Sequence, residues 1–193
     1  RCIQKDYGDN LKEYYTEKYD RFSSGELFSA DSIHFPDSLK YFTSKKSVVY
    51  GGGGIMPDIF VGLDTTENST FFADLVRKGI VNKYSLEFVD DNRSALKKQY
   101  STVEKFKSNF DWESQHLTAF KEYVAKEELE WNEEEFLRSK NAIVLRIEAL
   151  IARNIFDNEA FYYVISDLND ALQEALRVLN SNEYKKTLLA TKS

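Results

Sequence analysis

The sequence predicts a mainly α protein in which a small β-containing segment precedes a C-terminal helical bundle. Apolar residues recur every three or four positions through most of the chain, which is typical of amphipathic helices. Glycine and proline, which interrupt helices, are concentrated near the start: after Thr65 there is no proline and one glycine, Gly79. We therefore expect a boundary near residue 64, so that residues 1–64 and 65–193 form two unlike parts.

The first part is expected to combine one helix with short strands. Apolar spacing predicts a helix over residues 9–22, capped by Asp9 or Asn10 and stopped by Gly25. Three short strands are expected at residues 39–43, 48–50 and 59–61, with Ser44-Lys45-Lys46 as the turn between the first two.

The second part is expected to be a series of packed helices. Their N-terminal caps are predicted at Asn68 or Ser69, Thr102, Asn132, and Asp157 or Asn158. Gly79 should end the first helix, and Asp90-Asp91-Asn92 should break the next. The last two helices carry broad apolar stripes, which must pack on each other: Phe136, Ile143, Ile147, Leu150 and Ile151 in one, and Phe161, Val164, Ile165, Leu168, Leu172, Leu176 and Leu179 in the other.

The charge and cysteine content exclude several classes of function. A net charge of −6 argues against a nucleic-acid partner, because phosphate binding needs clustered Lys and Arg. The lone Cys2 allows neither an internal disulfide nor a cysteine zinc site. No apolar run has the length of a membrane span. The chain begins at Arg1 without a methionine, so we expect it to belong to a longer protein.

The run Gly51-Gly52-Gly53-Gly54 is the most distinctive segment, and it suggests a phosphate-binding loop. No Gly-Lys-Ser/Thr follows it, and Pro57 and an apolar run come next, so neither a phosphate loop nor a dinucleotide fingerprint fits. A tightly turned backbone leading into a strand is the better interpretation. We expect no cofactor.

The other reactive residue types form no recognisable site. His34 and His116 lack the partners of a metal site, and we expect both to be structural. The glutamates at 127–128 and 133–135 are expected on solvated helix faces, and no serine lies in a nucleophile elbow. Trp112 and Trp131 flank acidic residues, which suggests exposure at an interface.

Several segments resemble one peptidase family in the right order. Arg1-Cys2-Ile3-Gln4 and Gly54-Ile55-Met56-Pro57-Asp58-Ile59 are similar to two segments of carboxy-terminal processing (tail-specific) serine peptidases. Residues 25–32 and 49–54 resemble an envelope-associated bacterial branch of that family, and residues 149–153 and 170–179 resemble the end of its chains. The resemblance covers nearly the whole sequence.

The resemblance implies that the chain follows the catalytic part of such a peptidase. The family's serine nucleophile and lysine base lie in motifs that do not occur here, so no catalytic residue is carried over. Gly54, Pro57 and Asp58 match a structural segment that leads into a strand. Residues 1–64 would then complete a larger α/β protease core, and residues 65–193 would be a helical domain. The piece alone is expected to be inactive.

The resemblance also implies partners and a location. The partners would be the rest of the peptidase and its protein or peptide substrates, in the periplasm or cell envelope, and the helical part could serve as a scaffold, a homo-oligomer contact or a substrate-access element. A stand-alone helical protein-interaction module, using a surface around Trp112 and Trp131, is the alternative. Residues 1–64 could also pair among themselves or between chains when separated from a larger sheet.

Overall fold

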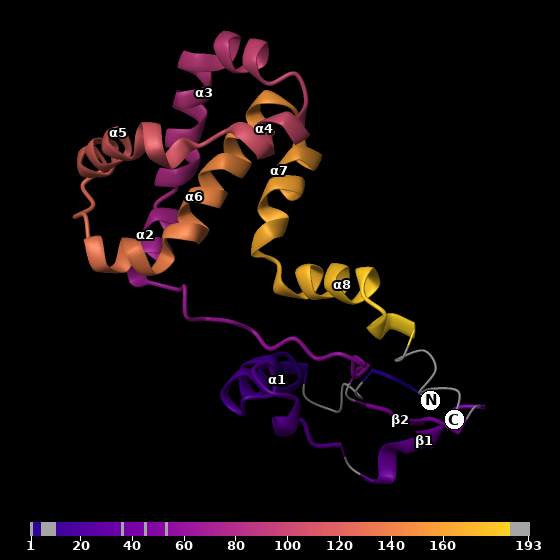
Figure 1. Cartoon of the computed structure of the whole chain (residues 1–193). Helices are drawn as coiled ribbons and strands as arrows, with labels where there is room; N and C mark the ends of the chain where they lie inside the picture. The colour runs from indigo at the N-terminus through magenta and orange to yellow at the C-terminus, as the bar shows by residue number, and fades with distance from the viewer. Residues whose placement is uncertain (1, 5–10, 36, 45, 53, 186–193) are drawn as a thin grey trace. The chain divides into compact units, whose positions relative to one another are not determined.

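The computed structural model describes residues 2–4, 11–35, 37–44, 46–52 and 54–185. The protein is mainly α, with a small two-stranded antiparallel sheet near the start, as the sequence predicts. The chain divides into two compact units: Thr65–Asn169, called here the helical unit, and Arg1–Asp64 with Asp170–Ser193, called the glycine-rich unit (Figure 1). None of the described helices is long and apolar enough to cross a bilayer.

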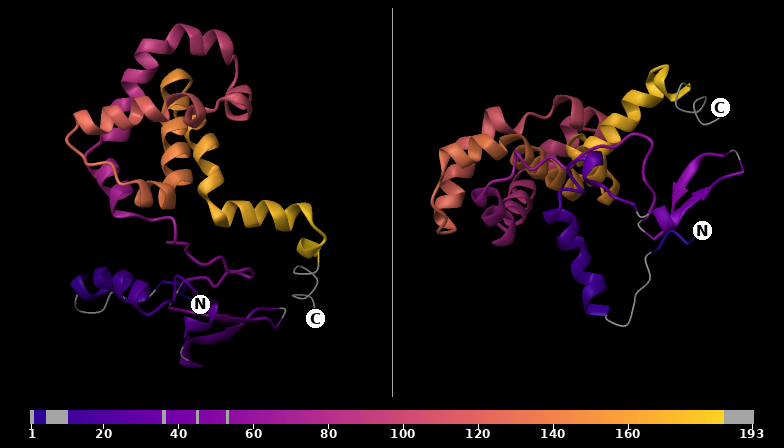
Figure 2. Two further views of the ribbon diagram at one scale, coloured as in Figure 1. Left: turned by 60° about the vertical axis from the view of Figure 1, so that its left-hand side comes forward. Right: turned by 90° about the horizontal axis from the view of Figure 1, so that it is seen from below.

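The helical unit is built around one long central helix. Its elements are α2 (Thr70–Arg77), α3 (Ile80–Gln99), α4 (Val103–Asn109), α5 (Trp112–Lys126), α6 (Glu133–Ile155), α7 (Asn158–Ile165) and the 3₁₀ turn η3 (Ser166–Leu168). Helix α6 packs against α2, α3, α5 and α7, and the views in Figures 1 and 2 show it among these neighbours. The core of the unit therefore forms around α6.

Side-chain caps define where these helices begin. Ser69, Thr102, Asn132 and Asp157 each accept a hydrogen bond from a backbone N–H in the first turn, as the sequence predicts. Asp111 caps α5 in the same way. Four N–H groups at a helix start have no partner within the helix, so each cap satisfies one of them and fixes the boundary.

Gly79 separates α2 from α3 and has a left-handed φ of 72°. Its position just after the end of α2 confirms the predicted helix stop, because glycine adopts this conformation without a steric penalty. The predicted break at Asp90-Asp91-Asn92 is wrong, since α3 continues to Gln99. Val89 and Leu96 on either side are buried in the core, and their packing keeps this polar stretch helical.

The predicted apolar stripe of α6 is confirmed. Its members are at most 2% exposed: Phe136, Ile143, Ile147, Leu150 and Ile151. Fully burying one such side chain contributes about 1.5–3 kcal/mol, so this stripe is a major part of the stability of the unit. The same core includes buried residues from every other helix of the unit, α2 to α7.

The single long helix expected from Asp157 to Leu179 is wrong. Helix α7 ends at Ile165, η3 follows, and Asn169 takes an extended conformation before α8 (Asp170–Asn180). The hydroxyl of Ser166 donates to the carbonyl of Tyr163, a local bond that competes with continued helix.

Only the part of the predicted stripe that lies in α7 reaches the core. Val164 is buried, whereas Leu172, Leu176 and Leu179 on α8 are 40%, 46% and 60% exposed. Helix α8 is accordingly grouped with the glycine-rich unit, whereas the expected helical part ran to residue 193.

The glycine-rich unit contains few regular elements. They are α1 (Leu11–Ser23), the 3₁₀ turns η1 (Ala30–Ser32) and η2 (Asp37–Leu39), β1 (Lys40–Phe42), β2 (Val48–Tyr50) and α8. Strands β1 and β2 pair antiparallel, with Tyr41 opposite Val49, which confirms the predicted hairpin. Gly25, with a φ of 86°, follows the end of α1 as expected, whereas the predicted caps Asp9 and Asn10 lie outside the described residues.

The third strand predicted at Ile59–Val61 is wrong, because these residues are described and are not in a strand. A strand requires a neighbouring backbone to hydrogen-bond with. Within the described part of the chain the nearest bond of this kind joins the N–H of Leu63 to the carbonyl of Leu27, which is isolated and extends into no ladder.

Candidate functional site

The glycine run joins the hairpin to the start of the chain through backbone hydrogen bonds. The N–H of Gly51 donates to the carbonyl of Leu39 at 2.9 Å. The N–H groups of Gly52 and Gly54 donate to the carbonyls of Cys2 and Ile3 at 3.0 and 2.8 Å. Two segments that are about fifty residues apart in the sequence are therefore bonded side by side.

Close approach and backbone conformation explain why glycines occupy this run. A Cβ on Gly51 would lie 2.9 Å from the carbonyl oxygen of Cys2 and 3.1 Å from the ring of Tyr41. Gly54 has open space around it but a φ of 90°, which other residues rarely adopt. A side chain at position 51 would therefore clash with its neighbours, and a side chain at position 54 would fit but would require an unfavourable backbone conformation.

These bonds bear on whether the run can bind an anion. A phosphate cradle needs several backbone N–H groups that point at the ligand. The described N–H groups of Gly51, Gly52 and Gly54 are already bonded to carbonyls of the protein. The run therefore acts as a backbone connection, in agreement with the interpretation from its sequence.

The family-motif residues Gly54, Pro57 and Asp58 lie together in the exposed segment 54–58. Two apolar side chains of the same segment are also exposed, Ile55 at 67% and Met56 at 37%. The segment leads into residues 59–61, which follow it without forming a strand. It presents apolar surface and backbone, and among the described residues no group of His, Cys, Asp and Glu side chains that could hold a metal ion is found there.

The histidines and the turn serine each lie in a different local setting. His34 lies beside the carbonyl of Ser32 in the glycine-rich unit. His116 is in the helical unit, where its ring packs edge-on against Phe88 and burial lowers its pKa. Ser44 lies in the exposed hairpin turn. In the part of the chain that the structure describes, no three His, Cys, Asp or Glu side chains meet in a way that could hold a metal ion.

A shallow, open hollow in the glycine-rich unit is lined by Phe60, Gly62 and Arg177 among others. The guanidinium of Arg177 is already bonded to the carboxylates of Glu174 and Glu183 at 2.6 and 2.8 Å. Its charge is therefore neutralised by its own neighbours, and the hollow offers a ligand little to bind.

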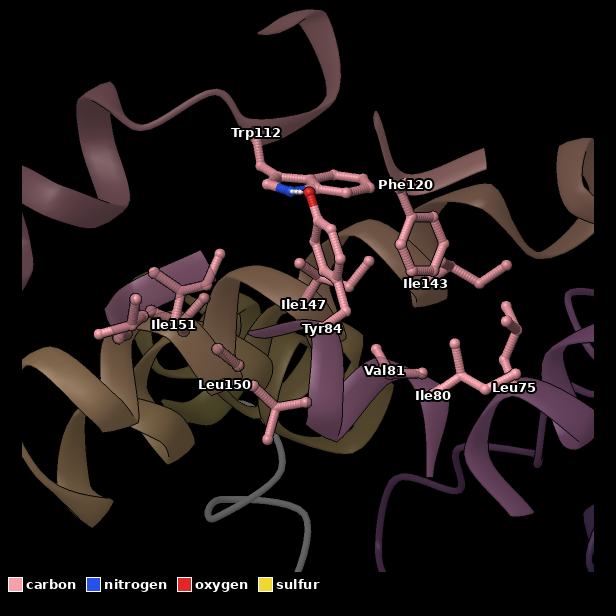
Figure 3. Close-up of a cluster of buried hydrophobic side chains, with 14 of the residues drawn as sticks. Leu75, Ile80, Val81, Tyr84, Trp112, Phe120, Ile143, Ile147, Leu150 and Ile151 are labelled. Carbon is pink, nitrogen blue, oxygen red and sulfur yellow. Dashed lines mark hydrogen bonds between the residues drawn. The ribbon is translucent and has the colours of Figure 1, made fainter. Parts of the chain in front are cut away.

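The expected exposure of the two tryptophans is wrong for Trp112. Trp112 is fully buried, and its indole N–H donates to the hydroxyl of Tyr84 at 3.2 Å (Figure 3). Trp131 is partly buried and packs against Phe71 and Phe136. Both rings belong to the core, because their neighbours in space are aromatic even though their neighbours in sequence are acidic.

An aromatic cluster surrounds the bond between Tyr84 and Trp112. The ring of Tyr84 contacts Trp112, Phe120 and Tyr123 in edge-to-face geometry, with centroids 4.8–5.8 Å apart. Burial raises the pKa of the Tyr84 hydroxyl, so that it stays a neutral hydrogen-bonding partner at ordinary pH. This cluster ties α3 to α5.

Glu148 is a carboxyl group in an unusual setting that the sequence analysis did not identify. It lies on α6 between two buried residues, Ile147 and Ala149, and accepts a hydrogen bond from the backbone N–H of Trp112 at 3.1 Å. Burial raises its pKa to about 7, while that hydrogen bond acts in the opposite direction. Its place beside the apolar stripe of α6 was the signal that could have identified it.

The comparisons with known proteins concern the helical unit. Residues 71–157 match the model of a family described as "Family of unknown function (DUF8443)". The match runs from α2 to the residue that caps α7, so it covers helices α2 to α6, which supply most of the core, and stops before α7. No curated protein matches the chain, and no solved structure does.

Proposed function

We propose that this chain is the C-terminal, non-catalytic part of a carboxy-terminal processing serine peptidase of the bacterial envelope. The observation that carries the proposal is the pairing of the two motif segments. Cys2 and Ile3 of the first segment accept hydrogen bonds from Gly52 and from Gly54, the first residue of the second. Both segments resemble the same family, and their backbones meet although the sequence separates them.

The exposed surface of the glycine-rich unit supports the same proposal. Among its described residues, Phe42, Ile55 and Tyr19 are 66–67% exposed, and Val178 on α8 is the buried apolar residue. A stable domain must bury enough apolar surface to offset the entropy of ordering its chain. Residues 1–64 thus have the character of an edge that a larger protease core would cover.

In this proposal the chemistry belongs to a Ser/Lys pair elsewhere in the parent protein, whose substrates are proteins or peptides. The 193-residue chain alone should not cleave an unfolded protein that carries a C-terminal tag, whereas the parent should. Cleavage by the purified chain that persists after further purification would overturn the proposal. The coding sequence upstream of Arg1 provides an independent test, since it should encode a serine in a small-residue stretch and a Gly-Lys motif.

The helical unit would act within the parent as a scaffold, an oligomer contact or a substrate-access element. We expect deletion of residues 65–169 from the parent to change either its oligomeric mass or its selectivity among unfolded substrates. Light scattering and cleavage of a substrate panel measure these two properties. If both stay unchanged, the helical unit has none of these roles.

A stand-alone interaction module was the alternative, with its partner surface around Trp112 and Trp131. Trp112 is fully buried and offers no such surface, whereas Trp131 packs on the core and is only partly buried. A start codon or signal peptide directly before Arg1 would favour the module nonetheless.

A further inference from the structure

Glu148 is a partly buried carboxyl group that forms no ion pair with any residue the structure describes. In the described part of the chain it has no ion-pair partner, and its one hydrogen bond comes from the N–H of Trp112, the first residue of α5. A carboxylate in such a place loses hydration that a single N–H replaces only in part. The ionised form of Glu148 is therefore disfavoured by its position.

The charged groups around Glu148 reinforce this effect. On the α5 side, Asp111 and Glu113 are both acidic and both disfavour a further negative charge. Among the described residues, Glu113 is paired with Lys140 on α6 at 2.6 Å, whereas no ion pair is found for Asp111 or Glu148. Helix α3 contributes Tyr84, whose neutral hydroxyl accepts a hydrogen bond from the indole N–H of Trp112.

We propose that the contact between Glu148 on α6 and the first turn of α5 is a proton-operated latch. Protonated Glu148 stays bonded to the backbone N–H of Trp112 and holds the two helices together. Ionised Glu148 is drawn toward water, and its movement loosens the start of α5. The inference concerns the helical unit alone and stands independently of the peptidase proposal.

We expect Glu148 to change its protonation state near neutral pH, because the effects that raise its pKa outweigh the hydrogen bond from Trp112, which lowers it. Burial raises the pKa of Glu148 to about 7, and the charges of Asp111 and Glu113 act in the same direction. The carbonyl of a protonated carboxyl group still accepts from the N–H of Trp112, so the closed latch keeps its hydrogen bond. Loss of the proton adds a negative charge close to those of Asp111 and Glu113, and among the described residues no cation is paired with Glu148 to offset it.

Trp112 is well placed to report the change. Its backbone N–H is bonded to Glu148, its ring is fully buried, and its indole N–H is bonded to Tyr84. The chain has one other tryptophan, Trp131. Incorporation of 5-fluorotryptophan therefore gives two ¹⁹F signals in the unmodified sequence, and W131F identifies the signal of Trp112.

The experiment follows the ¹⁹F signal of Trp112 from pH 5 to 8.5, in the original chain and in E148Q. We expect a reversible shift with a midpoint near pH 7 that E148Q abolishes, because glutamine keeps the shape and the acceptor but cannot ionise. E134Q is the matched control, since Glu134 is on the same helix and its side chain is 89% exposed. It should leave the shift unchanged.

His116 titrates in an adjacent range and needs its own control. Burial lowers its pKa from 6.5, so its contribution should appear at more acidic pH than that of Glu148. The shift near pH 7 should persist in H116Q. Direct ¹³C titration of the Glu148 carboxyl covers the case in which E148Q fails to fold. An ordinary carboxyl midpoint near 4.5, or a shift of Trp112 that survives in E148Q, would overturn the proposal.

Discussion

Replacing Tyr84 with phenylalanine tests whether one buried hydrogen bond holds α3 to α5. The substitution removes the hydroxyl that accepts from the indole N–H of Trp112 at 3.2 Å and leaves the ring in place. Tyr84 is 6% exposed and Trp112 is fully buried, so water cannot easily replace the lost acceptor. The change therefore isolates the cost of one unpaired buried donor.

Leaving a buried N–H without a partner costs about 1–3 kcal/mol. The aromatic contacts of position 84 with Phe120 and Tyr123 survive in the variant, because they involve the ring. We expect Y84F to lower the free energy of unfolding by about 2 kcal/mol. For a unit of roughly 100 residues this corresponds to a decrease in melting temperature of about 8–16 °C.

Urea unfolding of Y84F, W112F and the double variant completes a double-mutant cycle. In the W112F background the hydroxyl of Tyr84 has lost its donor, so Y84F should cost about 1 kcal/mol less there than in the original chain. Y123F is the matched control, since the hydroxyl of Tyr123 donates to Glu87 in an exposed setting at 3.0 Å. Its loss should cost about 0.5 kcal/mol, the low end for a hydrogen bond, because water can replace the donor there.

Two outcomes would refute this reasoning. If Y84F and Y123F cost the same, burial does not make the bond between Tyr84 and Trp112 special. If Y84F lowers the unfolding free energy equally in the original chain and in W112F, the hydroxyl of Tyr84 acts through a partner other than Trp112.

Further predictions concern other contacts in the two units. S139A should lower the unfolding free energy by about 1–2 kcal/mol in urea titrations, because the buried hydroxyl of Ser139 donates to the carbonyl of Glu67 and contacts the hydroxyl of Ser69 at 2.8 Å; the matched surface change S108A should cost far less. G51A should speed hydrogen exchange at the N–H of Gly52 at least tenfold, since its Cβ would lie 2.9 Å from the carbonyl oxygen of Cys2; unchanged exchange would mean that the chain start is not held there. Residues 65–169 alone should keep the helical circular dichroism and the cooperative melting of the unit, because its core cluster lies within that range; a non-cooperative melt would show that the core needs other parts of the chain. Raising the pKa of Glu148 from 4.5 to about 7 contributes stability that is present below pH 4.5 and lost as the pH rises through 7. Partial exposure reduces the limit of about 3.4 kcal/mol to roughly 2 kcal/mol. About a quarter of this is already lost at pH 5, so unfolding titrations at pH 5 and 8 should differ by roughly 1.5 kcal/mol more in the original chain than in E148Q.

Local signals in the sequence were sufficient for most of the helix boundaries. Ser69, Thr102, Asn132 and Asp157 are short polar residues before apolar stripes, and each caps a helix because its side chain reaches an N–H in its own first turn. The hairpin was predictable for the same reason, since β1 and β2 pair with each other across a short turn.

The wrong predictions share a different cause. The polar run at Asp90-Asp91-Asn92 stays helical because residues around it are buried, and the apolar run at Ile59–Val61 is no strand because it joins no ladder in the described part of the chain. The apolar residues predicted to continue the last stripe, Leu172, Leu176 and Leu179 on α8, are exposed, because no described segment packs over them. In each case the outcome depends on a partner that is distant in the sequence.

The sequence by itself determined that the protein is mainly α, where most helices begin, and that its glycine run serves backbone geometry. These features depend on interactions within a few residues and on the absence of the side chains that phosphate binding needs. Only the tertiary structure decided that Trp112 is buried, that its backbone N–H donates to Glu148, whose pKa burial raises, and that the glycine run bonds to Cys2 and Ile3. Burial and long-range hydrogen bonds depend on which surfaces meet when the chain folds, and a local pattern does not contain that information.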